Sequence, residues 1–154
     1  MTRQNTDTDT LFTFFNEISI ISQLATAMFE QQLPHGLTIS QFSVLNWFVR
    51  VDAEATPTRL ARAFQVTGGA MTNTLKKLEA KGFVRVQPDA SSGRQKRVTM
   101  TPAGRRARDE SIAAIGPLLS EFADEFPAAG LQRQTRQLAK VRAYLDEYRY
   151  REPT

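Results

Sequence analysis

The sequence contains no cysteine and only one histidine, His35. The absence of cysteine excludes a disulfide framework and a thiol redox switch, and a cytoplasmic location is the simplest expectation. His35 lies between Pro34 and Gly36, and no further ligand residues follow at a metal-binding spacing. We therefore expect no metal site, and nothing in the sequence indicates a cofactor.

Long apolar runs and a targeting segment are also missing. No apolar run approaches the roughly eighteen residues that a membrane helix needs. Residues 1–10 are polar and lack the apolar core of a signal peptide, and we expect flexible ends at 1–10 and 149–154. The 154 residues, with 41% hydrophobic content and ten phenylalanines, suit one folded domain with helical extensions.

Residue combinations that support catalysis are absent as well. The chain offers no cysteine nucleophile, one histidine, and no pair of acids at a catalytic spacing. A nuclease would need a carboxylate cluster near its basic surface, and Glu79 and Asp89 are the only acids in the basic segment described next. We therefore expect that the protein is not an enzyme.

Acidic residues are scarce in one segment, between Arg59 and Arg108. Twelve Lys and Arg stand there against two acids, a net charge of +10, whereas the rest of the chain holds eight cations and fourteen acids, a net charge of −6. Clustered like charges repel one another, so a surface without a special partner usually mixes its signs. The excess indicates a polyanionic partner, DNA or RNA, and a chance basic patch is the alternative.

Hydrophobic periodicity predicts a mainly helical chain with one β-hairpin. Residues 11–33 form a helix whose apolar stripe is wider than one core requires, which indicates contact with a second chain. Threonine N-caps predict where four of the later helices start, and alternating residues predict the two hairpin strands. These later elements are helices 38–51, 57–64, 67–81, 102–125 and 131–148, a turn at 52–55, and strands 83–86 and 97–100.

The predicted N-caps are Thr38, which forms a capping box with Gln41, and Thr56, Thr67 and Thr101. Helix 67–81 is expected to bury the face of Met71, Leu75 and Leu78 and to end at Gly82 in the C′ position.

A short helix, a tight turn, a longer basic helix and a hairpin with a basic tip follow one another within residues 57–100. This order is typical of a winged helix-turn-helix, whose second helix enters the DNA major groove while the hairpin reaches the minor groove or the backbone. The fold class is therefore mainly α with a β-hairpin wing. The candidate DNA-contacting residues are Thr67, Gly69, Thr72, Asn73, Lys76, Lys77, Arg94, Lys96 and Arg59.

Simpler roles stay open for several of these residues. Thr67 could act only as a helix cap, and Thr72 and Asn73 could be solvated polar groups. Arg94 could be an idle residue at the wing tip, and Arg59 could be the exposed side of a short helix. Lysines are common on helices of this kind whether or not they touch a phosphate.

Three runs resemble the MarR family of bacterial transcription regulators: LTISQFSVL at 37–45, TRLA at 58–61 and MTNTLKKLEAKGFV at 71–84. The wing and the helix start that follows it, within 89–104, are similar to that family too. The resemblance extends over about residues 11–148. Its most specific part is the pattern of the wing.

The resemblance implies an obligate homodimer whose first and last helices interlock. It implies that a helical dimerisation region, residues 11–36 and 102–148, carries a winged helix-turn-helix region, residues 37–101. Such a dimer binds a near-palindromic operator, usually as a repressor. Many members of the family release DNA when a small aromatic or phenolic ligand binds between the dimer helices and the DNA-binding lobe.

Phe15, His35 and Trp47 are the candidates for lining such a ligand pocket. The alternative for Phe15 and Trp47 is a place in the core or the dimer interface, and for His35 a plain loop position. The absence of cysteine excludes the cysteine-oxidation mode of release that some relatives use.

Two features depart from the family's pattern. Ser92 stands where an acid often precedes the wing arginine, Arg94, by two positions, so Asp89 is the candidate to brace the hairpin instead. The glycine pair 68–69 opens the recognition helix without side chains. These glycines allow close backbone approach to a phosphate but leave base readout to later residues of the helix.

The predicted function is sequence-specific binding of double-stranded DNA by a homodimeric transcription regulator, with release by a small aromatic ligand. The alternative is a low-specificity architectural or RNA-binding winged-helix protein. The two differ in how strongly one inverted repeat is preferred over random duplex.

Overall fold

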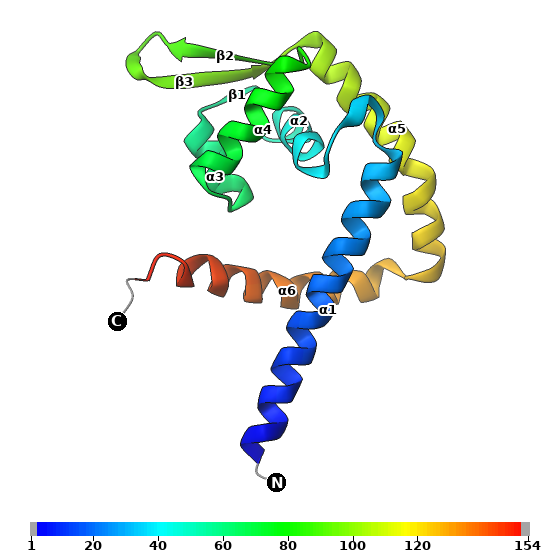
Figure 1. Ribbon diagram of the computed structural model, residues 1–154. Coiled ribbons are helices and arrows are strands. Elements are labelled where there is room, and N and C mark those ends of the chain that lie inside the picture. The colour runs from blue at the N-terminus through cyan, green and yellow to red at the C-terminus, as the bar shows by residue number, and fades with distance from the viewer. Residues whose placement is uncertain (1–2, 152–154) are drawn as a thin grey trace.

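Helices make up most of the molecule, and a hairpin projects from one end of it (Figure 1). The computed structural model describes residues 3–151. The prediction of a mainly helical fold with a β-hairpin wing is confirmed. In chain order the elements are α1 (Arg3–Gln32), the 3-10 turn η1 (Pro34–Gly36), α2 (Ile39–Arg50), β1 (Glu54–Ala55), α3 (Pro57–Phe64), α4 (Gly68–Ala80), β2 (Val84–Asp89), β3 (Ser92–Met100), α5 (Pro102–Glu125) and α6 (Ala128–Tyr148).

The hydrophobic core lies in the winged lobe, which α2, α3, α4, the sheet and the first half of α5 form together. Leu45, Leu60 and Leu78 are fully buried there, one each from α2, α3 and α4. Val98 of β3 closes the core on the side of the sheet. On α4, the three residues that the sequence places on the inward face are all buried. This packing holds the helix-turn-helix and the wing in one unit.

Four threonines start the helices of this lobe, as the sequence predicts. The side-chain oxygens of Thr38, Thr56, Thr67 and Thr101 each accept a hydrogen bond from the backbone N–H three residues further on. At α2 the Gln41 side chain also accepts the N–H of Thr38, which completes the predicted capping box. Each cap satisfies an N–H group that the helix itself leaves unpaired.

The hairpin strands are longer than the sequence predicts. β2 continues to Asp89, and only two residues separate it from β3. The expected first strand was too short because Pro88, which has no N–H, reads as a strand end. In the sheet order β1-β3-β2, however, β2 is an edge strand, where a proline is tolerated. Arg94 and Lys96 consequently lie on β3 and not in a loop.

A two-residue strand, β1, stands where the sequence predicts a turn at 52–55. Glu54 pairs with Thr99, and Ala55 with Val98, in antiparallel register. Two residues are too few for alternating hydrophobicity to be recognised. The pairing brings Glu54 to the middle strand of the sheet.

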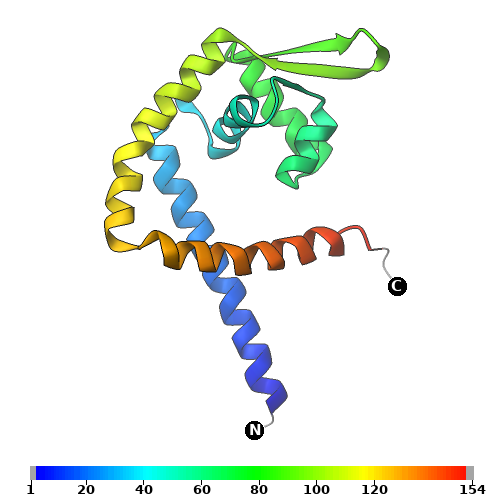
Figure 2. The same ribbon diagram turned by 180° about the vertical axis from the view of Figure 1, so that it is seen from behind.

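Two long helices, α1 and α6, extend beyond the lobe (Figures 1 and 2). α1 begins at Arg3, eight residues before the predicted start, so residues 3–10 of the expected flexible N-terminus are helical. Residues 1–2 and 152–154 of the two expected ends lie outside the described residues. In the part of the chain that the structure describes, no helix has the length and apolar character needed to cross a bilayer.

The apolar side chains of α1 and α6 are largely uncovered in the single chain. α6 contains no buried residue. On α1, Phe12 is 72% exposed and Leu24 is 66% exposed. The wide apolar stripe that the sequence predicts on this helix therefore stays open to solvent within one chain.

α5 starts in close contact with the backbone at Phe83. A Cβ atom added to Gly104 would lie 2.1 Å from the carbonyl oxygen of Phe83. The same carbonyl accepts the N–H of Thr101 at 3.0 Å. Because the carbonyl is held by this bond, it has little freedom to move away from a side chain at position 104.

Gly104→Ala should therefore lower the free energy of unfolding by about 1–3 kcal/mol, the usual cost of an overpacked contact. Gly130→Ala on α6 is the matched control, because a Cβ there meets only the end of the Arg133 side chain, at 3.9 Å. The control should be neutral or stabilise the protein by about 0.4–1 kcal/mol. Thermal unfolding followed by circular dichroism measures both, and equal melting temperatures for the two variants would contradict the close contact.

Candidate nucleic-acid interface

Most cations of the basic segment reach solvent without an acidic partner. Among residues 3–151, four of the twelve have protein partners for their charged groups: Arg59, Lys81, Arg97 and Arg108. Arg108 turns inward and donates from Nε and Nη2 to Asn46 Oδ1, at 3.0 and 2.8 Å. The other eight have no ion pair or hydrogen bond within the described residues and are exposed: Arg62, Lys76, Lys77, Arg85, Arg94, Lys96, Arg105 and Arg106.

α4 presents a polar face to solvent on the side opposite its buried leucines. Its N-cap, Thr67, accepts the N–H of Ala70 at 3.1 Å, so the predicted cap is confirmed. All predicted contact residues of this helix are exposed on it or at its start: Thr67, Gly69, Thr72, Asn73, Lys76 and Lys77.

The glycine pair at the start of α4 has no packing reason within the chain. A Cβ added to Gly68 or to Gly69 would meet no heavy atom within 4 Å. Glycine inside a helix is less favourable than alanine by roughly 0.5–1 kcal/mol. The pair therefore leaves the first turn of α4 bare without any gain in internal packing.

The wing carries its predicted cations on the middle strand. Arg94 and Lys96 are two residues apart on β3, and both are exposed. Lys96 pairs with Pro88, whereas Arg94 lies in the irregular part of the ladder before the next pair, Asp89 with Ser92. Asp89 Oδ1 accepts the N–H of Ser91 at 3.1 Å and its hydroxyl at 3.0 Å, which closes the turn. These two bonds lower the pKa of the Asp89 carboxyl below its ordinary value. Asp89 thus braces the hairpin, as the sequence indicates.

The base of the wing is tied to α4. Glu79 Oε2 accepts the N–H of Val86 at 2.8 Å, and α4 is thereby joined to β2. Thr101 at the other strand donates its hydroxyl to the carbonyl of Gly82 at 2.6 Å. Gly82 has a φ of 75°, in the left-handed region that ends a helix well only with glycine, so the predicted C′ glycine is confirmed.

Arg59 is held by groups of its own lobe. Its Nη1 lies 2.6 Å from Asp52 Oδ2, and its guanidinium lies 5.0 Å from the ring centre of Trp47. The hydrogen bond from Arg59 is the main cause that lowers the pKa of the Asp52 carboxyl. The structure therefore gives Arg59 an ion pair and a ring contact, while half of its side chain stays exposed.

The acids around the basic segment are the residues that sequence reasoning missed. Asp52, Glu54, Glu79 and Asp89 are all of the acids between residues 51 and 108, and each makes a polar contact that holds the helix-turn-helix or the wing. Only the role of Asp89 could be expected, because its partner is two residues away. The other three contacts join residues that are seven or more positions apart. Within the described residues, no three His, Asp or Glu side chains gather as a metal site.

The three candidate ligand residues do not meet in one pocket. Trp47 packs against the core of the lobe, edge-on to Phe48, and the Arg59 guanidinium lies over its ring. His35, in η1, contacts the carboxylate of Glu110 on α5 through Nε2, and its ring lies edge-on to that of Phe83.

Phe15 alone of the three lines a cleft between α1 and α6. The cleft has a volume of about 730 Å³ and is mostly apolar. Gln65, in the turn before α4, also lines it, so the cleft touches both the long helices and the winged lobe. Sequence reasoning missed the α6 side, because nothing local shows which helix faces Phe15. The lining includes Ile18, Ile21, Leu138, Arg142 and Leu145.

Residues 35–95 match the sequence model of the MarR family. The fold is similar to that of the transcriptional regulator BldR from Sulfolobus solfataricus, with a TM-score of 0.76 and 25% identity over 94% of this chain and 99% of that one. It is also similar to a mutant MarR from E. coli complexed with operator DNA, with a TM-score of 0.77 and 25% identity over 86% of this chain and 96% of that one. No curated protein sequence matches the chain.

A third solved structure concerns regulation by a small molecule. BpsR from Bordetella bronchiseptica, whose DNA binding is regulated by 6-hydroxynicotinic acid, is 21% identical, with a TM-score of 0.73 over 84% of this chain and 98% of that one. This likeness concerns the fold alone. Members of the MarR family are transcriptional regulators and not enzymes. The match over residues 35–95, the winged fold and the two regulators at 25% identity show that this chain is similar to the MarR family of transcriptional regulators.

Proposed function

We propose that this protein is a homodimeric, sequence-specific DNA-binding regulator that represses transcription from a near-palindromic operator. One observation carries the proposal: eight exposed cations without a protein partner gather on the helix-turn-helix, the wing and the first turn of α5 of a single lobe. Like charges without counter-ions destabilise a compact state, so this arrangement is favourable only when a polyanion neutralises it. The E. coli MarR that was crystallised with operator DNA supports duplex DNA as that polyanion.

The exposed face of α4 would read the major groove. Thr72 and Asn73 can donate to and accept from base edges, and Asn bonds adenine well. Lys76 and Lys77 would contact phosphates or guanine, and Gly69 would let the backbone approach the duplex closely. Thr67 keeps its capping role and stands beside the phosphates.

The wing would flank α4 along the DNA backbone. Arg94 would enter a narrow A·T-rich minor groove, where a guanidinium is attracted by the enhanced negative potential. Lys96, two residues further along β3, would contact a phosphate next to it. Arg59 is already paired with Asp52, so its contact with a phosphate would be shared with that acid.

A second copy of the chain would cover the apolar faces of α1 and α6. Exposed apolar patches of this extent mark interaction surfaces. We propose residues 11–36 and 102–148 as the dimerisation region and residues 37–101 as the DNA-binding region. Two-fold symmetry would then set the two α4 helices about one DNA turn apart.

A small aromatic acid is the effector that the cleft between α1 and α6 suits best. Apolar side chains such as Phe15 and Leu138 would hold a ring, and Arg142 would pair with a carboxylate. Because Gln65 of the lobe also lines the cleft, a bound ligand would press on both the lobe and the long helices. A coupling of about 1–3 kcal/mol would change DNA affinity 5- to 150-fold. His35 and Trp47 lie outside this lining.

The purified protein should bind one inverted repeat, selected from genomic fragments, at least about 10³-fold more tightly than random duplex. If the dimer neutralises about eight phosphates, affinity should fall about 10³-fold or more between 50 and 200 mM salt. Fluorescence anisotropy with competitor duplexes measures both quantities. Equal affinity for random DNA or for double-stranded RNA would favour the low-specificity alternative instead.

Arg94→Ala should weaken operator binding by about 1–3 kcal/mol for a base-contacting arginine. The melting temperature should stay unchanged, because Arg94 is exposed and has no partner within the described residues. Arg50→Ala on α2 is the matched control, since it removes the same charge from an exposed position that is neither a candidate DNA contact nor in the proposed dimerisation region. An affinity loss no larger than that of the control would remove Arg94 from the interface.

Phe12→Glu should disrupt the dimer and abolish tight operator binding while the lobe stays folded. Phe12 is 72% exposed on α1 and belongs to no described cleft, so the change leaves the core and the proposed ligand site intact. Analytical ultracentrifugation measures the oligomeric state. A wild-type protein that sediments as a monomer at the concentration where it binds the operator would contradict the proposed dimer.

A further inference from the structure

We propose that Glu54 is a positioning residue, which fixes the wing against the helix-turn-helix by holding Arg97. The proposal rests on the proposed function, because it concerns how the wing is presented to DNA. In this proposal Arg97 holds the wing in place, although it is one of the twelve cations of the basic segment.

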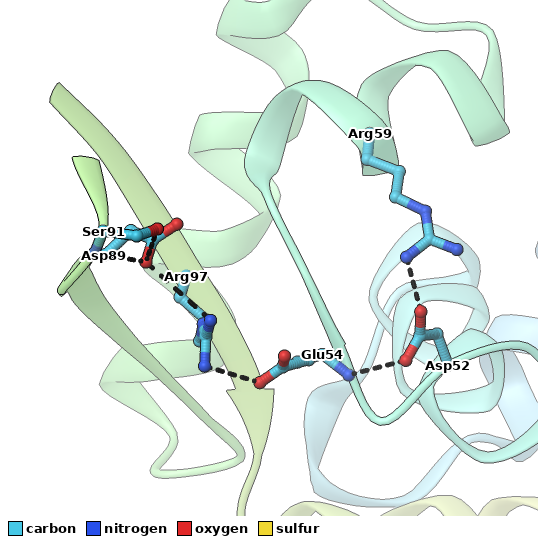
Figure 3. A network of polar contacts seen from close by, with 6 residues as sticks. All are labelled: Asp52, Glu54, Arg59, Asp89, Ser91 and Arg97. Atoms are coloured by element: carbon cyan, nitrogen blue, oxygen red, sulfur yellow. Dashed lines mark hydrogen bonds and ion pairs between the residues drawn. The ribbon is translucent and has the colours of Figure 1, made fainter.

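The contacts of Arg97 join β3 to two acids (Figure 3). Its Nη1 lies 3.0 Å from Glu54 Oε2, on β1, and its Nη2 lies 3.8 Å from Asp89 Oδ1, at the hairpin turn. The same oxygen of Asp89 accepts both hydrogen bonds from Ser91. One guanidinium thus connects the turn of the hairpin with the strand that borders the helix-turn-helix.

The network continues from Glu54 to α3. The N–H of Glu54 donates to Asp52 Oδ1 over a long 3.5 Å, and Asp52 Oδ2 lies 2.6 Å from Arg59 Nη1. Figure 3 shows these five residues and Ser91 as one line of polar contacts from the hairpin turn to α3. The wing and the helix that braces α4 are therefore joined by polar contacts along the exposed surface.

The outer half of the hairpin has few other anchors. The Glu79 contact with Val86 lies at the base of β2. Among the side-chain hydrogen bonds and ion pairs of residues 87–97 within the described chain, only the pair of Arg97 with Glu54 joins the hairpin to another element. β1 itself holds β3 by two residue pairs, which is a short ladder. A wing anchored in this way would swing more freely once the carboxylate of Glu54 is lost.

An exposed ion pair of this kind is weak when it stands alone. About half of each side chain is exposed, 48% for Arg97 and 47% for Glu54, so water screens the attraction. Loss of the Glu54–Arg97 pair should change operator affinity more than the free energy of unfolding, because each operator-bound dimer presents two wings. Each wing that loses its anchor must be ordered again on binding, at a cost in entropy.

The direction in which Glu54→Gln changes operator affinity distinguishes a positioning role of Glu54 from a purely electrostatic one. Glu54 is an acid beside a segment of net charge +10, so its neutralisation raises the positive charge that faces DNA. Charge alone therefore predicts tighter binding for Glu54→Gln. A positioning role predicts weaker binding, by about 3- to 10-fold, because two freed wings each lose a contribution of the size of an exposed pair.

The control for charge is Asp109→Asn. Asp109 is exposed on α5 and contacts only its neighbour Arg108, which Asn46 also holds, so this change leaves the wing untouched. Operator affinity of this variant should stay within about twofold of the wild type. If Glu54→Gln binds as tightly as this control, or more tightly than the wild type, the proposal is overturned.

A charge swap tests whether the pair itself matters. Glu54→Lys adds two positive charges to the lobe and should nevertheless weaken binding. Combining it with Arg97→Glu restores the net charge and rebuilds the pair with its polarity reversed. The double variant should bind more tightly than Glu54→Lys alone, although the acid at position 97 no longer pairs with Asp89. A double variant weaker than both single variants would overturn the bracing role.

Wing mobility can be read without DNA, because the chain has no native cysteine. A nitroxide on Gln95→Cys, in the outer part of β3, should show a sharper, more mobile spectrum once Glu54→Gln is added, with an unchanged melting temperature. An unchanged spectrum together with unchanged operator affinity sinks the inference and leaves the proposed function standing. A more mobile wing in a protein that binds no duplex, even as wild type, rejects the proposed function and keeps the anchoring of the wing.

Discussion

The lobe has to keep many like charges close together without losing its shape. Eight exposed cations of one lobe have no acidic partner among the described residues, and their repulsion opposes compact folding. Three kinds of contact work against it. Buried leucines from α2, α3 and α4 form the core, threonine caps fix the starts of the helices, and the few acids hold the wing. Because the acids are used as anchors, the surface that remains open is almost purely basic.

The acidic side chains also hold the exposed wing and the start of α3 in place. Glu79 holds the base of the hairpin, Asp89 closes its turn, and Glu54 takes the guanidinium between them. Asp52 keeps Arg59 against Trp47, beside α3. The carboxyls of Asp52 and Asp89 have lowered pKa values because their hydrogen-bond donors favour the charged form, so both stay ionised at neutral pH.

Local features of this fold could be predicted from the sequence, and contacts between distant segments could not. The four threonine caps, Gly82 and the inward face of α4 depend on neighbouring residues, and all were predicted correctly. β1 was missed because its two residues become a strand only through pairing with β3. Pro88 was misread as a strand end because its place on an edge strand depends on the order of the sheet. The inward turn of Arg108 toward Asn46 could not be seen in a count of charges.

The candidate site shows the same division. Periodicity along one helix was enough to collect the exposed residues of α4, whereas the cleft beside Phe15 depends on where α6 lies. In the proposed dimer, two lobes face one duplex with two-fold symmetry. Hydroxyl-radical footprinting of the selected operator tests it most directly. The account predicts two protected regions related by symmetry, about one helical turn apart, each flanked by a protected minor groove. A single protected region, or uniform protection without a centre of symmetry, would contradict the symmetric dimer.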